Sequence, residues 1–182
     1  MTDRRRRFEA QALPHLDAAY NLARWLVRPP LDAEDIVQDA MLRAYRAFDT
    51  VRGENVKAWL LTIVRNCFLT AAEQNKNRQN SPLPADDEIS AGDSALIAGD
   101  ADPEATVIQD QTRRHLDRLL SALPHDFREV LVLRELEDLS YSEIAKIVGI
   151  PVGTVMSRLA RARALLRENW HVAEKGDRHV LQ

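Results

Sequence analysis

The sequence predicts an all-α fold of two small helical domains joined by a flexible acidic linker, the second a four-helix domain with a helix-turn-helix. The 182 residues are rich in Ala, Leu, Arg and Glu, which lose little side-chain freedom in a helix. Apolar residues recur at helical spacing in two stretches, and a segment of Pro, Gly, Ser and acids with little periodicity separates them. We therefore expect domains over residues 1–78 and 112–182, with the linker over 79–111.

Three helices are expected before the linker. The first covers residues 8–27 and is stopped by Pro29 and Pro30. The arginines at 4–7 are expected to form a frayed basic terminus, with contact to DNA or a membrane as the alternative. The second follows Asp32, a residue type that caps helix N-termini, and extends to about Phe48. Its inward stripe is Val37, Ala40, Met41, Ala44 and Phe48.

The third helix is expected over residues 56–78, after a loop at 49–55 that is marked by its Asp, Gly and Asn content. Its inward stripe is Leu60, Ile63, Val64, Cys67 and Ala71. Because Cys67 lies on this stripe, we expect a buried, unreactive thiol.

Four helices are expected after the linker. The first, over residues 113–122, ends before Pro124, and the second contains the segment DFREVLVLREL. The inward residues of that segment are Phe127, Val130, Leu131 and Leu133. Ser140 and Glu143 have the spacing of a capping box at the start of the third helix, which ends at Gly149. The fourth helix starts at about Pro151, with a proline in its first turn.

The last two helices, joined by a tight turn containing Gly149, have the pattern of a helix-turn-helix, whose second helix enters the DNA major groove. The expected inward stripe of this second helix is Val155, Leu159, Ala162 and Leu166. The outward residues, which we predict contact DNA, are Gly153, Thr154, Ser157, Arg158 and Arg161. Hydroxyl and amide groups at a helix N-terminus bind phosphate, and arginine binds guanine or phosphate. The alternative is a solvated basic helix face.

Charge and cysteine content narrow the function classes. The net charge is -3, but residues 79–112 contain eight acids and no Lys or Arg, which leaves 25 basic and 20 acidic residues elsewhere. A single cysteine excludes an internal disulfide, and no Cys or His has metal-ligand spacing, so we expect no metal and no cofactor. No apolar run is long enough to span a bilayer or to serve as a secretory signal, so we expect a cytoplasmic protein.

Two segments then resemble one family. The segment LPHDFREVLVLRELEDLSYSEIAKIVGIPVGTVMSRLARAR is similar to the minus-thirty-five-recognition domain of the extracytoplasmic-function (ECF) sigma factors of bacterial RNA polymerase. DAEDIVQDAMLRAYRAF and VKAWLLTIVRNCFLTAAEQNKNR resemble the core-binding and minus-ten-recognition domain of the same family. The resemblance implies a sigma factor that binds core polymerase, reads the minus-thirty-five duplex and melts the minus-ten element, with no catalysis of its own.

The resemblance also implies residue roles. Contacts with the clamp helices of the polymerase largest subunit would come from Asp35, Gln38, Asp39 and Leu42. The loop at 49–55 would capture an unstacked base of the minus-ten element. Contacts with the melted strand or the duplex edge would come from Asn55, Lys57, Trp59, Thr62, Arg65 and Asn66. Two alternatives stay open, namely that Asp35 is a solvated acid of a first helical turn and that Trp59 is a core residue.

The implied partners are core RNA polymerase, promoter DNA and an anti-sigma factor, with no small-molecule substrate and a monomer in the absence of partners. The acidic linker either mimics a phosphate backbone and shields the basic faces or serves only as a solubilising tether. The second functional hypothesis is a free-standing transcription regulator. Such proteins usually bind as dimers to paired half-sites, and neither end of this chain shows an obvious dimerisation helix. The sequence does not support an enzymatic function, because the chain has no nucleophilic side chain paired with a general base at catalytic spacing.

Overall fold

The computed structural model of the chain describes residues 3–51, 55–79 and 115–178, the last eight of them as backbone only. Every regular element in these ranges is helical, and the described residues contain no strand, which confirms the all-α prediction. Residues 1–2, residues 52–54 of the loop at 49–55, residues 80–114 with all but the first residue of the predicted acidic linker, and the last four residues lie outside the described ranges.

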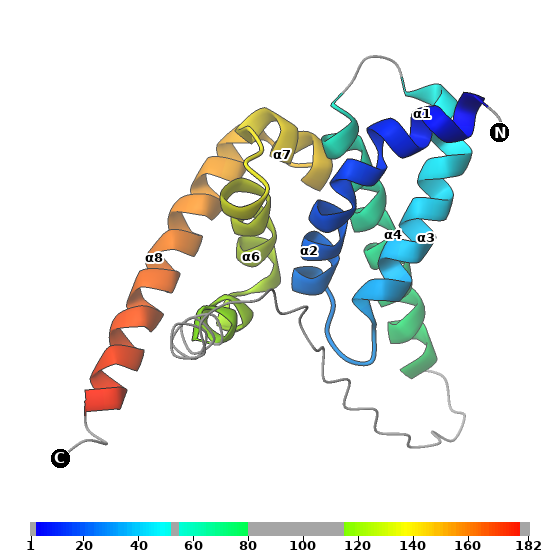
Figure 1. Cartoon of the computed structure of the whole chain (residues 1–182). Helices are drawn as coiled ribbons and strands as arrows, with labels where there is room; N and C mark the ends of the chain where they lie inside the picture. Colours follow the sequence, from blue (N-terminus) through cyan, green and yellow to red (C-terminus); the bar gives the residue numbers. More distant parts are fainter. Residues whose placement is uncertain (1–2, 52–54, 80–114, 179–182) are drawn as a thin grey trace, which may run out of the picture.

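The N-terminal helices are α1 (Asp3–Gln11), α2 (Leu16–Leu26), α3 (Ala33–Ala47) and α4 (Val56–Gln79), with short 3₁₀ turns η1 (Leu13–His15) and η2 (Phe48–Thr50) (Figure 1). The prediction of one helix over residues 8–27 is wrong, because η1 separates α1 from α2. Pro14 lies in this turn and lacks the N–H that a continuous helix would need there.

The arginines at the N-terminus do not form the frayed end that we expected. They belong to α1, in which Arg4 and Arg7 make ion pairs with Asp49 of η2 at 3.3 and 3.1 Å. A guanidinium N–H of Arg4 also donates to the Arg46 carbonyl oxygen at 2.7 Å. Helix α1 is thereby fixed against the end of α3 and the first residues of the loop that follows it.

The caps of α3 and α7 agree with the sequence patterns. The Asp32 carboxylate accepts a hydrogen bond from the Glu34 N–H at 2.7 Å at the start of α3. Ser140 and Glu143 form both hydrogen bonds of a capping box at the start of α7 (Tyr141–Val148). Gly149 ends α7 in the left-handed conformation, with φ of +74°, which glycine adopts without the steric cost that other residues incur.

The C-terminal helices comprise a helix over residues 115–122, α6 (His125–Leu131), α7 and α8 (Val152–Arg178). The four predicted helices are therefore present, although α6 continues into a π-helical turn, η3 (Val132–Leu136). The fourth starts one residue later than expected, since Pro151 precedes α8 and its carbonyl accepts from the Val155 N–H at 3.1 Å.

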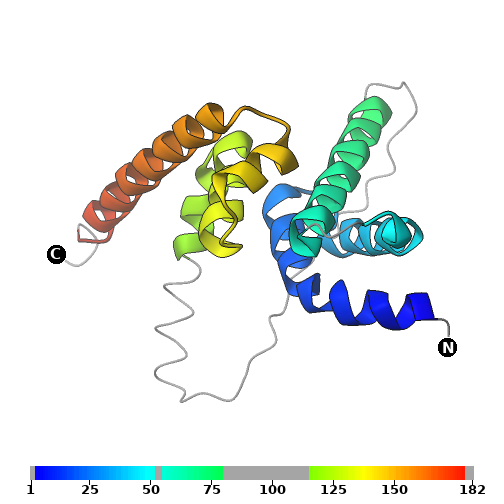
Figure 2. The same ribbon diagram turned by 90° about the horizontal axis from the view of Figure 1, so that it is seen from above.

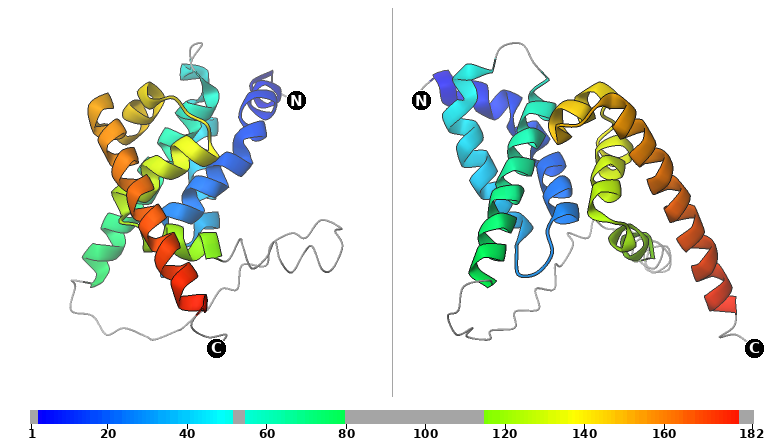
Figure 3. Two further views of the ribbon diagram at one scale, coloured as in Figure 1. Left: turned by 90° about the vertical axis from the view of Figure 1, so that its left-hand side faces the viewer. Right: turned by 180° about the vertical axis from the view of Figure 1, so that it is seen from behind.

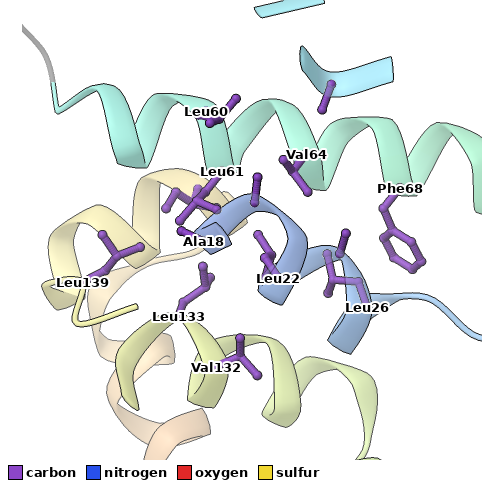
Figure 4. Packing of buried hydrophobic residues seen from close by; sticks show 14 of the residues in the cluster. Ala18, Leu22, Leu26, Leu60, Leu61, Val64, Phe68, Val132, Leu133 and Leu139 are labelled. Carbon is purple, nitrogen blue, oxygen red and sulfur yellow. The ribbon is translucent and has the colours of Figure 1, made fainter. Parts of the chain in front are cut away.

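The N-terminal and C-terminal helices pack against each other and share one apolar core. Figures 1 and 2 show α2 and α4 beside α6 and α7, with α1 and α3 on the far side of the N-terminal helices. At the junction, Leu61 of α4 lies near Leu133 and Leu139, and all three side chains are buried (Figure 4). The predicted stripe of α4 was therefore incomplete, since Leu61 and Phe68 are buried in addition.

Cys67 is buried in the N-terminal helices, as its position on the apolar stripe predicted. Burial, together with the nearby Asp39 carboxylate, raises the pKa of the Cys67 thiol to about 11. The thiol is therefore protonated at neutral pH and lacks the thiolate character that reactive cysteines have. In the described part of the chain, no helix combines the length and the apolar character that crossing a bilayer requires.

Candidate nucleic-acid interface and docking surface

The α7–α8 pair has the geometry of a helix-turn-helix. The N–H groups of Gly149 and Ile150 both donate to the Ala145 carbonyl oxygen, at 2.9 and 3.1 Å, so the chain reverses tightly after α7. Val155 of α8 faces back into the core and is fully buried. These contacts fix α8 against α7, as the positions of the turn glycine and of the inward stripe predicted.

The outer face of α8 contains the five residues that we predicted to contact DNA. Gly153, Ser157 and Arg161 are exposed, and Thr154 is half-buried. A Cβ atom at Gly153 would meet nothing within 4 Å, so the surface is open at this residue. On the opposite side, the expected inward residues are buried: Val155, Leu159 and Ala162 completely, and Leu166 in part.

Arg158 is less free than the sequence suggested. Its guanidinium lies 2.7 Å from the Asp126 carboxylate of α6, and 23% of its side chain is exposed. The ion pair holds the guanidinium beside the outer face of α8, where it would have to leave Asp126 to bind a base or a phosphate. No sequence pattern marked Asp126 as a partner.

The beginning of α4 meets the beginning of α7. The Asn55 side-chain oxygen accepts from the Ala58 N–H at 3.3 Å, which caps α4, while its amide nitrogen donates to Glu143 Oε1 at 2.6 Å. The other Glu143 oxygen accepts from the Ser140 N–H and hydroxyl at 2.8 and 2.6 Å. Hydrogen bonds from Ser140, and then from Asn55, hold the pKa of the Glu143 carboxyl below its usual value.

Two cations of α4 make ion pairs with glutamates of the C-terminal helices. Lys57 Nζ lies 2.9 Å from Glu137 Oε2 and donates to the Glu137 carbonyl oxygen at 2.8 Å. Arg65 Nε donates to Glu129 Oε1 at 2.7 Å. Both glutamates are buried, with exposed fractions of 1% for Glu129 and 5% for Glu137. Predicted DNA-contacting side chains therefore already have anionic partners within the chain.

The other three predicted minus-ten residues lie in different surroundings. Trp59 packs edge-on against Phe48, with 6.3 Å between ring centroids, and belongs to the margin of the core. The Thr62 hydroxyl donates to the Ala58 carbonyl oxygen at 2.8 Å within α4. Asn66 is exposed. Trp59 thus has the surroundings of a core residue, which is the alternative to DNA contact that the sequence left open.

The four predicted polymerase-contacting residues lie on α3, on the side of the molecule away from the C-terminal helices (Figure 3). Asp35 and Gln38 line a shallow groove of about 520 Å³ between α2 and α3. Its other lining residues are Leu16, Asp17, Tyr20, Glu34, Val37 and Met41. Asp39 makes an ion pair with Arg43 at 2.8 Å, and Leu42 is 53% exposed. This surface combines acids with accessible apolar side chains.

Comparison with known proteins decides the family. Residues 13–78 match the family model "Sigma-70 region 2", and residues 113–166 match "Sigma-70, region 4". The ECF RNA polymerase sigma-E factor of Escherichia coli K12 is 37% identical over 139 residues, which are 74% of this chain and 72% of the relative. The chain belongs to the ECF sigma factors of bacterial RNA polymerase. The resemblance stated from the sequence is thus confirmed.

Two further comparisons cover more of this sigma factor. The RNA polymerase sigma-H factor of Pseudomonas aeruginosa PAO1 is 32% identical over 166 residues, which are 87% of this chain and 83% of the relative. The sigma factor RpoE from Bartonella quintana, solved in complex with the anti-sigma factor NepR, has 30% identity and a TM-score of 0.68. That likeness covers 91% of this chain and 97% of the solved one.

Sequence reasoning missed the acidic partners of the predicted sites, namely Asp126, Glu129, Glu137 and Glu143. In the sequence, each is an acidic residue of a helix or turn with no mark of a distant partner. Only Glu143 had a predicted role, as part of the capping box. Their second role depends on contacts between residues far apart in the chain, which no local pattern encodes.

Proposed function

We propose that this sigma factor directs core RNA polymerase to promoters whose minus-thirty-five duplex is read by α8 and whose minus-ten element is opened and held along α4. The observation that carries the proposal is that both sigma-70 regions match within one chain. The chain itself needs no cofactor or reaction for this role, since the polymerase performs the chemistry.

Reading of the duplex is supported by the outer face of α8. A helix-turn-helix presents the N-terminal part of its second helix to base edges. In this part, Gly153 and Ser157 are exposed around an open surface, while Arg158 and Arg161 provide guanidinium groups. Arginine binds guanine through two hydrogen bonds or neutralises a phosphate. Thr154 and Ser157 would complete the contacts with phosphate oxygens.

Minus-ten binding is supported by the amide and cationic groups along α4. Asn55, Lys57, Arg65 and Asn66 all lie on this helix or at its start. Basic side chains hold a single strand through its phosphates, and pockets that accept unstacked bases favour strand opening. Trp59 contributes mainly by supporting the beginning of α4 against Phe48.

Docking on polymerase is supported by the exposed face of α3. Leu42 is the most exposed apolar side chain on this helix, and Asp35 and Gln38 lie beside a groove. An accessible apolar residue among acids matches the usual interface composition of a desolvated anchor with a polar rim. We assign this surface to the clamp helices of the largest polymerase subunit.

Replacing Leu42 tests the docking surface. Leu42→Asp should weaken binding to core polymerase by about tenfold or more, because it removes an apolar anchor and places a charge in the interface. The matched control is Leu69→Asp on α4, where the leucine is also exposed, at 41%. Titration of labelled sigma factor with core enzyme measures both. Equal affinities of the two variants would show that α3 is not the docking surface.

Run-off transcription tests the function as a whole. Purified sigma factor and core polymerase should together yield discrete transcripts from a library of genomic fragments, whereas each protein alone should yield none. A free-standing regulator would instead bind promoter fragments without polymerase and would not restore initiation to the core enzyme. Absence of transcripts despite stable binding to core polymerase would contradict the proposal.

We also propose an anti-sigma partner. The Bartonella RpoE structure is a complex with such a protein, and it resembles this chain over 91% of its length. An anti-sigma factor would prevent initiation by covering the surfaces assigned above to polymerase or to DNA.

A further inference from the structure

We propose that Glu129, Glu137 and Glu143 form an intramolecular latch, which holds the C-terminal helices on α4 and occupies the polar groups that α4 offers to DNA. The masking of DNA contacts rests on the proposed function, whereas the holding of the two sets of helices does not. The latch is defined by three contacts: Asn55 with Glu143, Lys57 with Glu137 and Arg65 with Glu129.

The three contacts are spread over the N-cap and the first ten residues of α4. They come from its N-cap residue, its second residue and its tenth residue, and the partners come from α7, the turn after η3, and α6. Polar groups spread over this length of a helix could contact successive phosphates of a nucleic-acid backbone. In the closed chain, carboxylates are paired with these groups.

The glutamates depend on the closed arrangement. Glu129 and Glu137 are almost completely buried, and a buried carboxylate is costly unless it is paired and hydrogen-bonded. The ion-pair partners of both, Arg65 and Lys57, belong to the N-terminal helices. Separation of the two sets of helices would therefore remove the cationic partners and hydrate both carboxylates together.

The backbone conformation around Glu137 positions this residue for its contact with Lys57. Glu137 follows the π-helical turn, where its N–H donates to the Val132 carbonyl oxygen at 3.2 Å, and Asp138 next to it has a positive φ of 52°. This reversal brings both the carboxylate and the carbonyl oxygen of Glu137 to Lys57. Asn21 of α2 donates to the other carboxylate oxygen at 3.4 Å.

The latch and DNA compete for the same donors. The Lys57 ammonium donates one N–H to the Glu137 carbonyl oxygen and lies 2.9 Å from its carboxylate, and the Arg65 Nε–H donates to Glu129. A phosphate oxygen cannot bind these N–H groups at the same time. The surface of α3 lies on the other side of the N-terminal helices from the described C-terminal helices (Figure 3). The closed chain therefore occupies Asn55, Lys57 and Arg65, while the described C-terminal helices leave the proposed polymerase surface accessible.

Two measurements on the full-length chain test the latch. Spin labels at Glu73→Cys on α4 and Arg167→Cys on α8, in a Cys67→Ala background, report the distance between the two sets of helices. The test variant carries Glu137→Gln and Glu143→Gln; glutamine still closes a capping box, so α7 keeps its start. The control is Glu135→Gln, whose ion pair with Arg163 stays within the C-terminal helices.

The double variant should show a new population at longer distances, and Glu135→Gln should match the parent chain. A fluorescent single-stranded DNA of mixed sequence, at fixed salt, should bind the double variant about fivefold or more tightly than the parent chain. Charge exchange gives an independent result: Lys57→Glu or Glu137→Lys alone should open the chain, and the two together should restore the short distance.

Unchanged distances in the double variant and in both single exchanges would overturn the latch. Longer distances without a gain in DNA affinity would support the latch and count against the assigned DNA role of α4. Failure of run-off transcription leaves the distance result unaffected, so the latch and the proposed function fail separately.

Discussion

Leu133→Ala should lower the free energy of unfolding by about 2–5 kcal/mol, the usual range for truncating a fully buried leucine. Leu133 is 0% exposed and lies in η3, and its side chain is at the junction of the N-terminal and C-terminal helices (Figure 4). The smaller side chain would leave a cavity between α4 and η3. Because a small protein is stable by only about 5–15 kcal/mol, the variant should unfold at a clearly lower urea concentration.

Leu136→Ala is the matched control for this prediction. Leu136 lies three residues later in the same π-helical turn but is 48% exposed. Its truncation should change stability by less than about 0.5 kcal/mol, as is usual for surface positions. Urea unfolding followed by circular dichroism measures both. Similar losses for the two variants would mean that Leu133 does not fill the junction.

Arg158→Ala should weaken binding of the polymerase holoenzyme to a cognate promoter by about 1–3 kcal/mol if its guanidinium reads a base. The same substitution should have little effect on a promoter whose minus-thirty-five element is scrambled. If Arg158 only neutralises a phosphate, both promoters should lose affinity equally. Titration of fluorescent promoter fragments at fixed salt separates the two cases.

Arg163→Ala serves as the control on the same helix. Arg163 is ion-paired with Glu135 at 2.6 Å, so it lies on a different side of α8 from the Arg158–Asp126 pair. This variant should keep the parent affinity for both promoters. A larger loss from Arg163→Ala than from Arg158→Ala would show that the face of α8 was assigned wrongly.

Local chemistry made most of the helices predictable. Asp32, the Ser140–Glu143 pair and Gly149 carry their signals within a few residues, and all three form the caps that the sequence predicted. The inward stripe of α8 was also predictable, because residues at helical spacing share a face. These features depend on the helix itself or on its immediate neighbour in the chain.

Contacts between the two sets of helices were not predictable in the same way. Leu61 was not on the predicted stripe of α4, yet it is buried at the junction near Leu133 and Leu139 (Figure 4). Glu129 had no role assigned from the sequence, yet it is 1% exposed and paired with Arg65. The break at Pro14 is a different case, since the proline was visible and its effect was underestimated.

Resemblance and helix periodicity were enough to select the candidate contact residues on α3 and α8, which lie at or near the surface in the structure. For the predicted minus-ten residues of α4, the sequence did not reveal the glutamates that pair with them. Pairing of distant charges depends on how the helices pack, so a list of cations on one helix cannot show which of them are available to a ligand.

The outward position of α3 bears on the order in which a transcription complex forms. With the docking surface and latch proposed above, polymerase would bind this side of the chain while the minus-ten contacts of α4 are still paired with glutamates, and promoter DNA would engage only after those pairs separate. Binding to polymerase would then precede binding to any promoter, and free copies of the chain would not occupy chromosomal DNA.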